Sequence, residues 1–230
     1  MHRHIQKNEP LYMQVYEIVK NAIMEGVWEP GEKLFESKVA NELQLSRSPV
    51  REAFRILEHE GLLVKRDHHI YVHQPSLEEM VELYQIRHSL EALSCSLAAE
   101  NAKDEEINEL QEIVQMTELA LKEKKSQEIY ECNTRFHEAI IYASNNKNLI
   151  SIMDGLRAKT LYCRNVLVHF DYFRKDNFFS EHYQIYEAIK NRDRQKAKIL
   201  MEHHISTDLE RILALFPKAK IKNKKGGLKC

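Results

Sequence analysis

Apolar residues recur at helical spacing along the first third of the chain, and this pattern predicts three short helices. The first is expected over residues 10–25, the second at about 36–43, and the third from 46 to the glycine at 61. Only Gln44 and Leu45 separate the second helix from the third. Two helices joined by such a tight turn indicate a helix-turn-helix motif, whose second helix is offered to DNA.

Two short apolar runs follow the third helix and predict a β-hairpin. Residues 62–66 and 70–73 have the composition of strands, and 67–69 form a polar turn between them. Three helices followed by a hairpin predict a winged helix-turn-helix domain, in which the hairpin is the wing. Wings commonly touch the DNA backbone.

The rest of the chain is expected to be helical almost throughout. Proline is absent between Pro75 and Pro217, and Gly155 is the only glycine in that interval. We therefore predict a mainly α fold with a winged helix-turn-helix domain at 1–75, an all-α bundle at 76–214 and a basic tail at 215–230. Ser76 is the expected cap of the first bundle helix. The six predicted bundle helices span 76–101, 104–124, 126–144, 147–170, 176–191 and 193–214.

Composition narrows the class of protein. The net charge is only −1, so attraction to nucleic acid must be local rather than global. No apolar run approaches the roughly 18 residues that a membrane span requires, and the N-terminal residues lack the apolar segment of a signal peptide. Four scattered cysteines suggest reduced thiols. These features favour a cytoplasmic location.

Arginines recur every four residues along one face of the third helix. Guanidinium groups match phosphate oxygens and the major-groove edge of guanine, and helix N-termini favour phosphate. The alternative is an ordinary solvated basic face. The residues expected to contact DNA, from this helix and from the wing, are Arg47, Ser48, Arg51, Arg55, Lys65, His68 and His69.

Three histidines of the bundle are candidates for a metal site. His137, His182 and His204 lie on three different predicted helices, and Asn133 precedes His137 by one helical turn. Three inward imidazoles can form a site with open positions for water or a carboxylate. The competing interpretation is that they are packing residues, since the chain has 12 histidines.

The N-terminal motifs resemble those of the GntR family of bacterial repressors. The resemblance covers residues 9–74 and is strongest in the segment Leu-Ser-Arg-Ser-Pro-Val-Arg-Glu-Ala at 45–53. It implies a sequence-specific DNA-binding regulator that represses transcription and acts as a homodimer on a pseudo-palindromic operator. Gln44 departs from the family, which usually has glycine before the recognition helix.

Residues 77–205 resemble the FCD ligand-binding domain of the FadR subfamily, through motifs that include Leu-Tyr-Gln-Ile-Arg at 83–87. That resemblance implies a divalent metal, usually zinc or nickel, held by one aspartate and three histidines. His137, His182 and His204 fall on the histidine positions, whereas Asn133 replaces the aspartate. Asn133 is expected to ligate through its neutral amide oxygen, which offers less charge and binds a hard cation more weakly. It also implies a small organic-acid effector.

Arg87 has two interpretations. Its spacing from Glu91 allows a surface ion pair along the helix. In the resembling domain an arginine at this position binds the carboxylate of the effector beside the metal, and a guanidinium is suited to that role. Tyr84, one turn earlier, is expected to add a hydroxyl.

Two classes of function remain to be compared. One is a ligand-responsive transcription factor, and the other is a metal-dependent hydrolase or lyase built on the three histidines. An enzyme of that kind needs a general base near the metal. Glu138 and Glu181 adjoin His137 and His182 in sequence, which turns their side chains away by about 100° on a helix. We therefore favour a regulator, not an enzyme; a bundle that serves only to dimerise is a third option.

Overall fold

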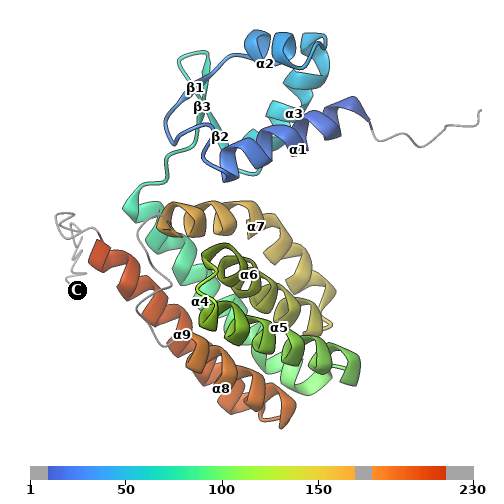
Figure 1. Cartoon of the computed structure of the whole chain (residues 1–230), viewed down its shortest axis with the longest axis vertical. Coiled ribbons are helices and arrows are strands. Elements are labelled where there is room, and N and C mark those ends of the chain that lie inside the picture. The colour runs from blue at the N-terminus through green and yellow to red at the C-terminus, as the bar shows by residue number, and fades with distance from the viewer. Residues whose placement is uncertain (1–9, 169–177, 216–230) are drawn as a thin grey trace, which may run out of the picture. The chain divides into compact units, whose positions relative to one another are not determined.

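The computed structural model describes residues 10–168 and 178–215, which form nine helices and a small three-stranded sheet. The contacts between them divide the chain into two units (Figure 1). The first unit ends at Gln74, and Gly155–Asn165 of a bundle helix also groups with it. The predicted mainly helical fold is confirmed. No helix in the described ranges combines the length and apolar character that a membrane span needs.

The three helices of the first unit are α1 (Leu11–Met24), α2 (Glu36–Glu42) and α3 (Arg47–His59). Each end agrees with the predicted one to within a few residues. The turn between α2 and α3 contains Gln44 at a φ of +56°, a left-handed conformation that glycine adopts most easily. This conformation explains why glycine is the expected residue at that position. Leu57 of α3 is completely buried and anchors the packing of α3 in this unit.

The wing is larger than the predicted hairpin. Strand β2 (Leu63–Arg66) pairs with β3 (His69–Val72), and their two-residue turn has positive φ at both positions, as tight hairpins require. A further strand, β1 (Lys33–Leu34), pairs antiparallel with β3, so the order in the sheet is β1-β3-β2. The sequence pattern missed β1, and the turn is one residue shorter than predicted.

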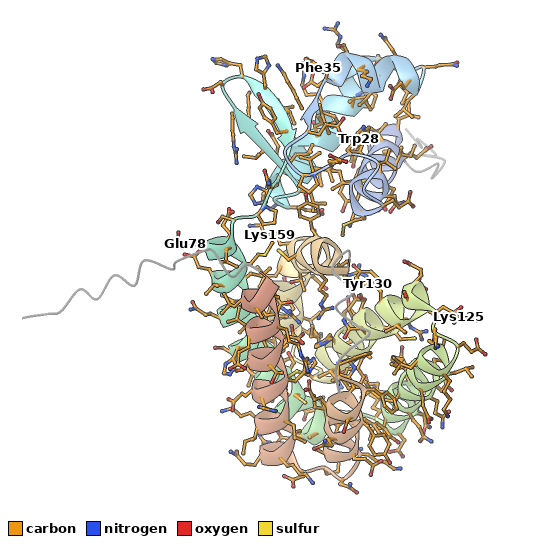
Figure 2. All side chains as sticks on the ribbon, turned by 60° about the vertical axis from the view of Figure 1, so that its left-hand side comes forward. Trp28, Phe35, Glu78, Lys125, Tyr130 and Lys159 are labelled. Atoms are coloured by element: carbon orange, nitrogen blue, oxygen red, sulfur yellow. The ribbon has the colours of Figure 1, made fainter. Side chains whose placement is uncertain are left out.

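Ser76 caps the first bundle helix, as predicted. Its hydroxyl accepts a hydrogen bond from the backbone N–H of Glu79, and the Glu79 carboxylate accepts one from the backbone N–H of Ser76. This capping box satisfies two backbone donors at the start of the helix. Glu78 lies in the same first turn (Figure 2), where the negative charge of an acidic side chain interacts favourably with the helix dipole.

In the bundle of the second unit, the main packing is between α4 (Leu77–Asn101) and α9 (Arg194–Leu215) (Figure 1). Helix α5 (Asp104–Lys122) packs on α6 (Ser126–Ala143), and α8 (Phe178–Lys190) packs on α9. The predicted basic tail lies almost wholly outside the described residues. The remaining helix of the six in the bundle is α7 (Lys147–Val168).

Candidate functional site

The basic side chains of α3 lie at the surface. Arg47, Ser48, Arg51 and Arg55 are all exposed. Arg51 pairs with Glu36 of α2 at 3.2 Å, and Arg55 approaches Glu52 at 3.7 Å. Exposed ion pairs contribute about 0–1 kcal/mol, so these two arginines are readily available to another partner.

The tip of the wing is also exposed and basic. Lys65, Arg66, His68 and His69 all face solvent at the β2–β3 turn. Each residue that the sequence predicts to contact DNA is therefore exposed, and all of these residues lie in the first unit. Their contacts with DNA remain a prediction.

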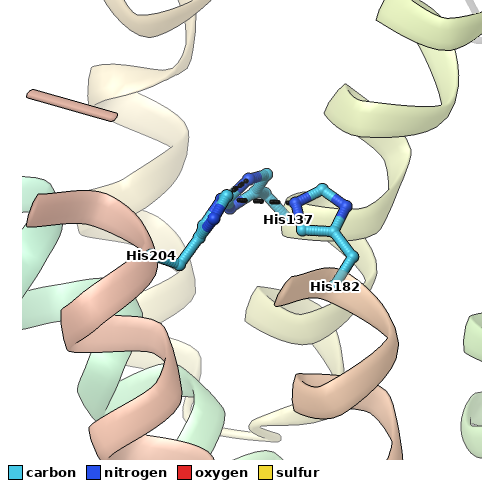
Figure 3. Close-up of side chains that lie close together, drawn as sticks. All are labelled: His137, His182 and His204. Carbon is cyan, nitrogen blue, oxygen red and sulfur yellow. Dashed lines mark hydrogen bonds between the residues drawn. The ribbon is translucent and has the colours of Figure 1, made fainter. Parts of the chain in front are cut away.

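In the second unit, three histidines from three helices come together (Figure 3). His137 lies on α6, His182 on α8 and His204 on α9, and each is at most 2% exposed. The Nε2 atom of His204 lies 3.2 Å from that of His182 and 3.4 Å from that of His137. Two nitrogens bound to one tetrahedral zinc ion are about 3.3 Å apart, given Zn–N bonds of about 2.0–2.1 Å. The spacing of these atoms fits a divalent metal ion.

Two carboxylates orient two of the three histidine rings. His137 Nδ1 lies 2.5 Å from Glu91 Oε2, and His204 Nδ1 lies 2.6 Å from Glu181 Oε2. A carboxylate accepts hydrogen bonds, so each imidazole donates its Nδ1 hydrogen and presents the Nε2 lone pair to the centre of the cluster. Carboxylate partners of this kind fix the ring orientation of metal-binding histidines. Phe136 stacks on His182 with ring centroids 4.1 Å apart, which adds packing on that ring.

Glu181 has a contact that the sequence did not indicate. Its side chain does turn away from the neighbouring His182 on α8, but it reaches His204 on the adjacent helix α9. Burial raises the pKa of the Glu181 carboxyl, yet the hydrogen bond from His204 and the charge of Arg211 outweigh burial and hold that pKa below its usual value. Its contact is with Nδ1, on the side of the ring away from the cluster centre. Glu181 therefore orients a ring rather than facing the centre as a base.

Arg87 is completely buried, so a surface ion pair is ruled out. Its Nε donates to Glu91 Oε1 at 2.7 Å, while Nη1 and Nη2 are buried without a hydrogen-bond partner. The guanidinium lies over the ring of Tyr84, 4.4 Å from the centroid, so Tyr84 contributes its aromatic face. Burial lowers the pKa of Arg87, but Glu91 and, after it, Tyr84 and Asp208 together more than offset burial, and the net shift is upward. Arg87 therefore stays charged.

Glu91 connects the arginine to the histidines. One of its oxygens accepts from Arg87 and the other accepts from His137, and its side chain is 3% exposed. The sequence pattern identified Glu91 only as the partner of Arg87. The contact with His137 crosses from α4 to α6, and helical spacing alone could not have indicated it.

The sequence also missed two residues of α9. Arg211 donates to Glu181 Oε1 and to Asp208 Oδ1, both at 3.0 Å. Asp208 follows His204 by one turn, and its Oδ2 lies 3.8 Å from His204 Nε2. The spacing of these three residues was a signal that could have found them, because positions three and four apart share a helix face. Asn133 is buried on α6, one turn before His137. Its role as a ligand remains a prediction.

Comparison with known proteins identifies the two units. Residues 11–69 match the family model for bacterial regulatory proteins of the gntR family, and residues 82–207 match the FCD domain. The chain belongs to the GntR family and carries an FCD domain. This family consists of transcriptional regulators rather than enzymes, and its members bind DNA operators and act as dimers.

Relatives of this GntR-family chain include the HTH-type transcriptional regulator YdhC of Bacillus subtilis (strain 168). The two are 31% identical over 210 residues, which span 90% of this chain and 93% of YdhC. The gluconate operon transcriptional repressor of Bacillus licheniformis is 27% identical over 176 residues, or 75% of this chain and 72% of the repressor. Regulators of this type therefore resemble the chain across both units.

Solved structures share the fold. Escherichia coli McbR/YncC matches with a TM-score of 0.74 at 22% identity, covering 91% of this chain and all (100%) of that one. A GntR regulator from Rhodococcus sp. RHA1 matches with a TM-score of 0.75 at 21% identity, covering 88% and 97% of the respective chains.

Proposed function

We propose that this GntR-family protein represses transcription from a specific operator, and that a small carboxylic acid controls its affinity for DNA. The acid binds in the second unit, at a divalent metal, zinc or nickel, held by the three histidines and at the guanidinium of Arg87. The observation that carries this proposal is the buried, charged Arg87 with two η nitrogens that lack a hydrogen-bond partner. Leaving such donors buried costs free energy, which a bound carboxylate recovers.

The arginines of α3 and the basic tip of the wing support the DNA-binding part of the proposal. A homodimer presents two copies of α3 to the two halves of a pseudo-palindromic operator. Arg47 is the first residue of this helix and is exposed, and helix N-termini favour phosphate.

Replacing Arg47 with alanine should weaken operator binding by about 1–3 kcal/mol without unfolding the protein. Arg194→Ala is the matched control, because it removes the same charge from an exposed position on α9. Operator binding of both variants can be measured by fluorescence anisotropy at two salt concentrations. Equal affinities for the parent, Arg47→Ala and Arg194→Ala would show that α3 is not the recognition helix.

The acid-binding part of the proposal relies on two neighbouring groups. The guanidinium of Arg87 holds one carboxylate oxygen or both through Nη1 and Nη2. His137, His182 and His204 would hold the metal, which would supply a Lewis-acidic centre for the acid. Sugar acids, 2-hydroxy acids and dicarboxylates all have this chemistry.

Glu91 supports a coupling between the acid and the metal. Because its two oxygens contact Arg87 and His137, a movement of Arg87 toward a ligand changes the hydrogen bond to a metal-binding ring. Arg87 also lies on α4, which begins only a few residues after β3 of the wing ends. Acid and operator should therefore affect each other's affinity reciprocally.

Arg87→Ala should abolish the response to acid and spare operator binding in its absence, because Arg87 lies outside the winged unit. Operator release would be titrated with gluconate, lactate and succinate for the parent, Arg87→Ala and Arg87→Lys. The lysine variant keeps the charge but loses the planar fork, so its response should be intermediate. Release of Arg87→Ala from the operator at the same acid concentration as the parent would remove Arg87 from the mechanism.

The alternative of a metal-dependent hydrolase or lyase has less support. Glu91 and Glu181 contact the clustered rings from α4 and α8 through Nδ1 atoms, whereas a general base has to face the Nε2 side, where the substrate and the metal would meet. Asp208 approaches the Nε2 of His204 at 3.8 Å, but its carboxylate is paired with Arg211 at 3.0 Å.

A further inference from the structure

A divalent ion at the three histidines would be surrounded by neutral ligands. A neutral imidazole contributes no charge, and neither does the amide of Asn133 one turn before His137. All four side chains are at most 5% exposed. A buried dication without a neighbouring negative charge is costly, so the protein needs a carboxylate close to the Nε2 side of the cluster.

Glu91 and Glu181 do not meet this need on that side of the rings. Each contacts an Nδ1 atom, on the side of the ring away from the centre of the cluster. Their arrangement serves to orient the rings.

Asp208 approaches the Nε2 side. It lies on α9 one turn after His204, and its Oδ2 is 3.8 Å from the Nε2 of that histidine. Its side chain is 9% exposed, so water screens its charge only weakly. Arg211 holds the other oxygen, Oδ1, at 3.0 Å, which fixes the orientation of the carboxylate.

We propose that Asp208 supplies the negative charge that stabilises a divalent cation at the histidine cluster, in place of the charge that Asn133 does not provide. This inference rests on the proposed metal site. Asp208 lies outside the group of histidine atoms that are all within 4.8 Å of one another. It therefore acts through its charge and not as a ligand, and Arg211 holds its carboxylate in place.

The test is the zinc affinity of the full chain, measured by competition with a chromophoric chelator. Asp208→Asn should weaken zinc binding by about 10- to 100-fold, the usual effect of losing a carboxylate beside the ligands. Glu210→Gln is the matched control, because it removes the same charge from an exposed position on α9, and it should bind zinc as the parent does. His182→Ala should bind far more weakly than any of these proteins.

Asn133→Asp provides a rescue that separates charge from structure. A carboxylate at position 133 should restore most of the lost affinity in the Asp208→Asn background, and it should add much less to the parent. If Asp208→Asn loses helicity, the zinc affinity of Asn133→Asp in the parent background decides the question instead. A 10-fold or larger gain in zinc affinity there overturns the proposal. Equal zinc affinity of Asp208→Asn and the parent overturns it while leaving the histidine site intact. A parent that binds no zinc refutes the metal site itself.

Discussion

Zinc should raise the melting temperature of the full chain by about 8–16 °C when it is present at a thousandfold excess over its dissociation constant. An ion that binds only the folded state stabilises it by about 4 kcal/mol at that excess. Each kcal/mol corresponds to about 2–4 °C in a chain of this size. The three Nε2 atoms come from α6, α8 and α9, so an ion bound to them would link three helices that are distant in sequence. A chelator should reverse the shift.

His204→Ala should abolish this zinc-dependent rise, because His204 Nε2 lies within 3.4 Å of both other Nε2 atoms. His203→Ala is a close control, since His203 is the preceding residue of α9 and is exposed. Melting would be followed by circular dichroism with added zinc, with nickel and with a chelator. A His204→Ala protein that zinc stabilises as strongly as the parent would contradict the three-histidine site.

Glu91→Gln should destabilise the metal-free protein by about 3–5 kcal/mol. The substitution keeps the size of the side chain but removes the negative charge beside Arg87, and both residues are at most 3% exposed. Breaking a buried ion pair by removing one partner leaves the other charge poorly compensated, and that accounts for the magnitude. Urea denaturation in the presence of a chelator measures the change in the free energy of unfolding without a contribution from metal.

A double-mutant comparison tests whether the destabilisation by Glu91→Gln comes from the loss of the ion pair with Arg87. Replacing Arg87 and Glu91 together with leucine should cost less than Glu91→Leu alone, because no charge is then left buried without its partner. Glu78→Gln, at an exposed position on the same helix, should change stability by only a few tenths of a kcal/mol. If the cost of the double variant equals the sum of the costs of Arg87→Leu and Glu91→Leu, the ion pair between Arg87 and Glu91 contributes little to stability.

The sequence predicted the helices well, because their apolar spacing and caps are local properties. The Ser76 capping box and the end of α3 before Gly61 are both visible in the order of the residues. Strand β1 was missed for a physical reason. Its two residues, Lys33 and Leu34, form a strand only because they pair with β3, and a two-residue strand has no periodicity of its own.

The site was predictable only in part. The three histidines could be assigned to inward helix faces, and the structure brings them together. The side chains that orient them come from other helices, and those contacts depend on how the helices pack. Glu181 illustrates this dependence, since its angle to His182 on α8 says nothing about its contact with His204 on α9. Asp208 could have been found from the sequence, because it follows His204 by four residues and such positions share a helix face.

The shared carboxylate of Glu91 has an evolutionary consequence. One of its oxygens is committed to the arginine and the other to a histidine, so neither neighbour can be exchanged independently of the other. In the proposed site, a lineage that replaced Arg87 to recognise a different compound would also disturb His137, a member of the histidine cluster. New specificity should therefore arise more readily through other positions around the ligand, and Arg87, Glu91 and His137 should be inherited or lost as a set.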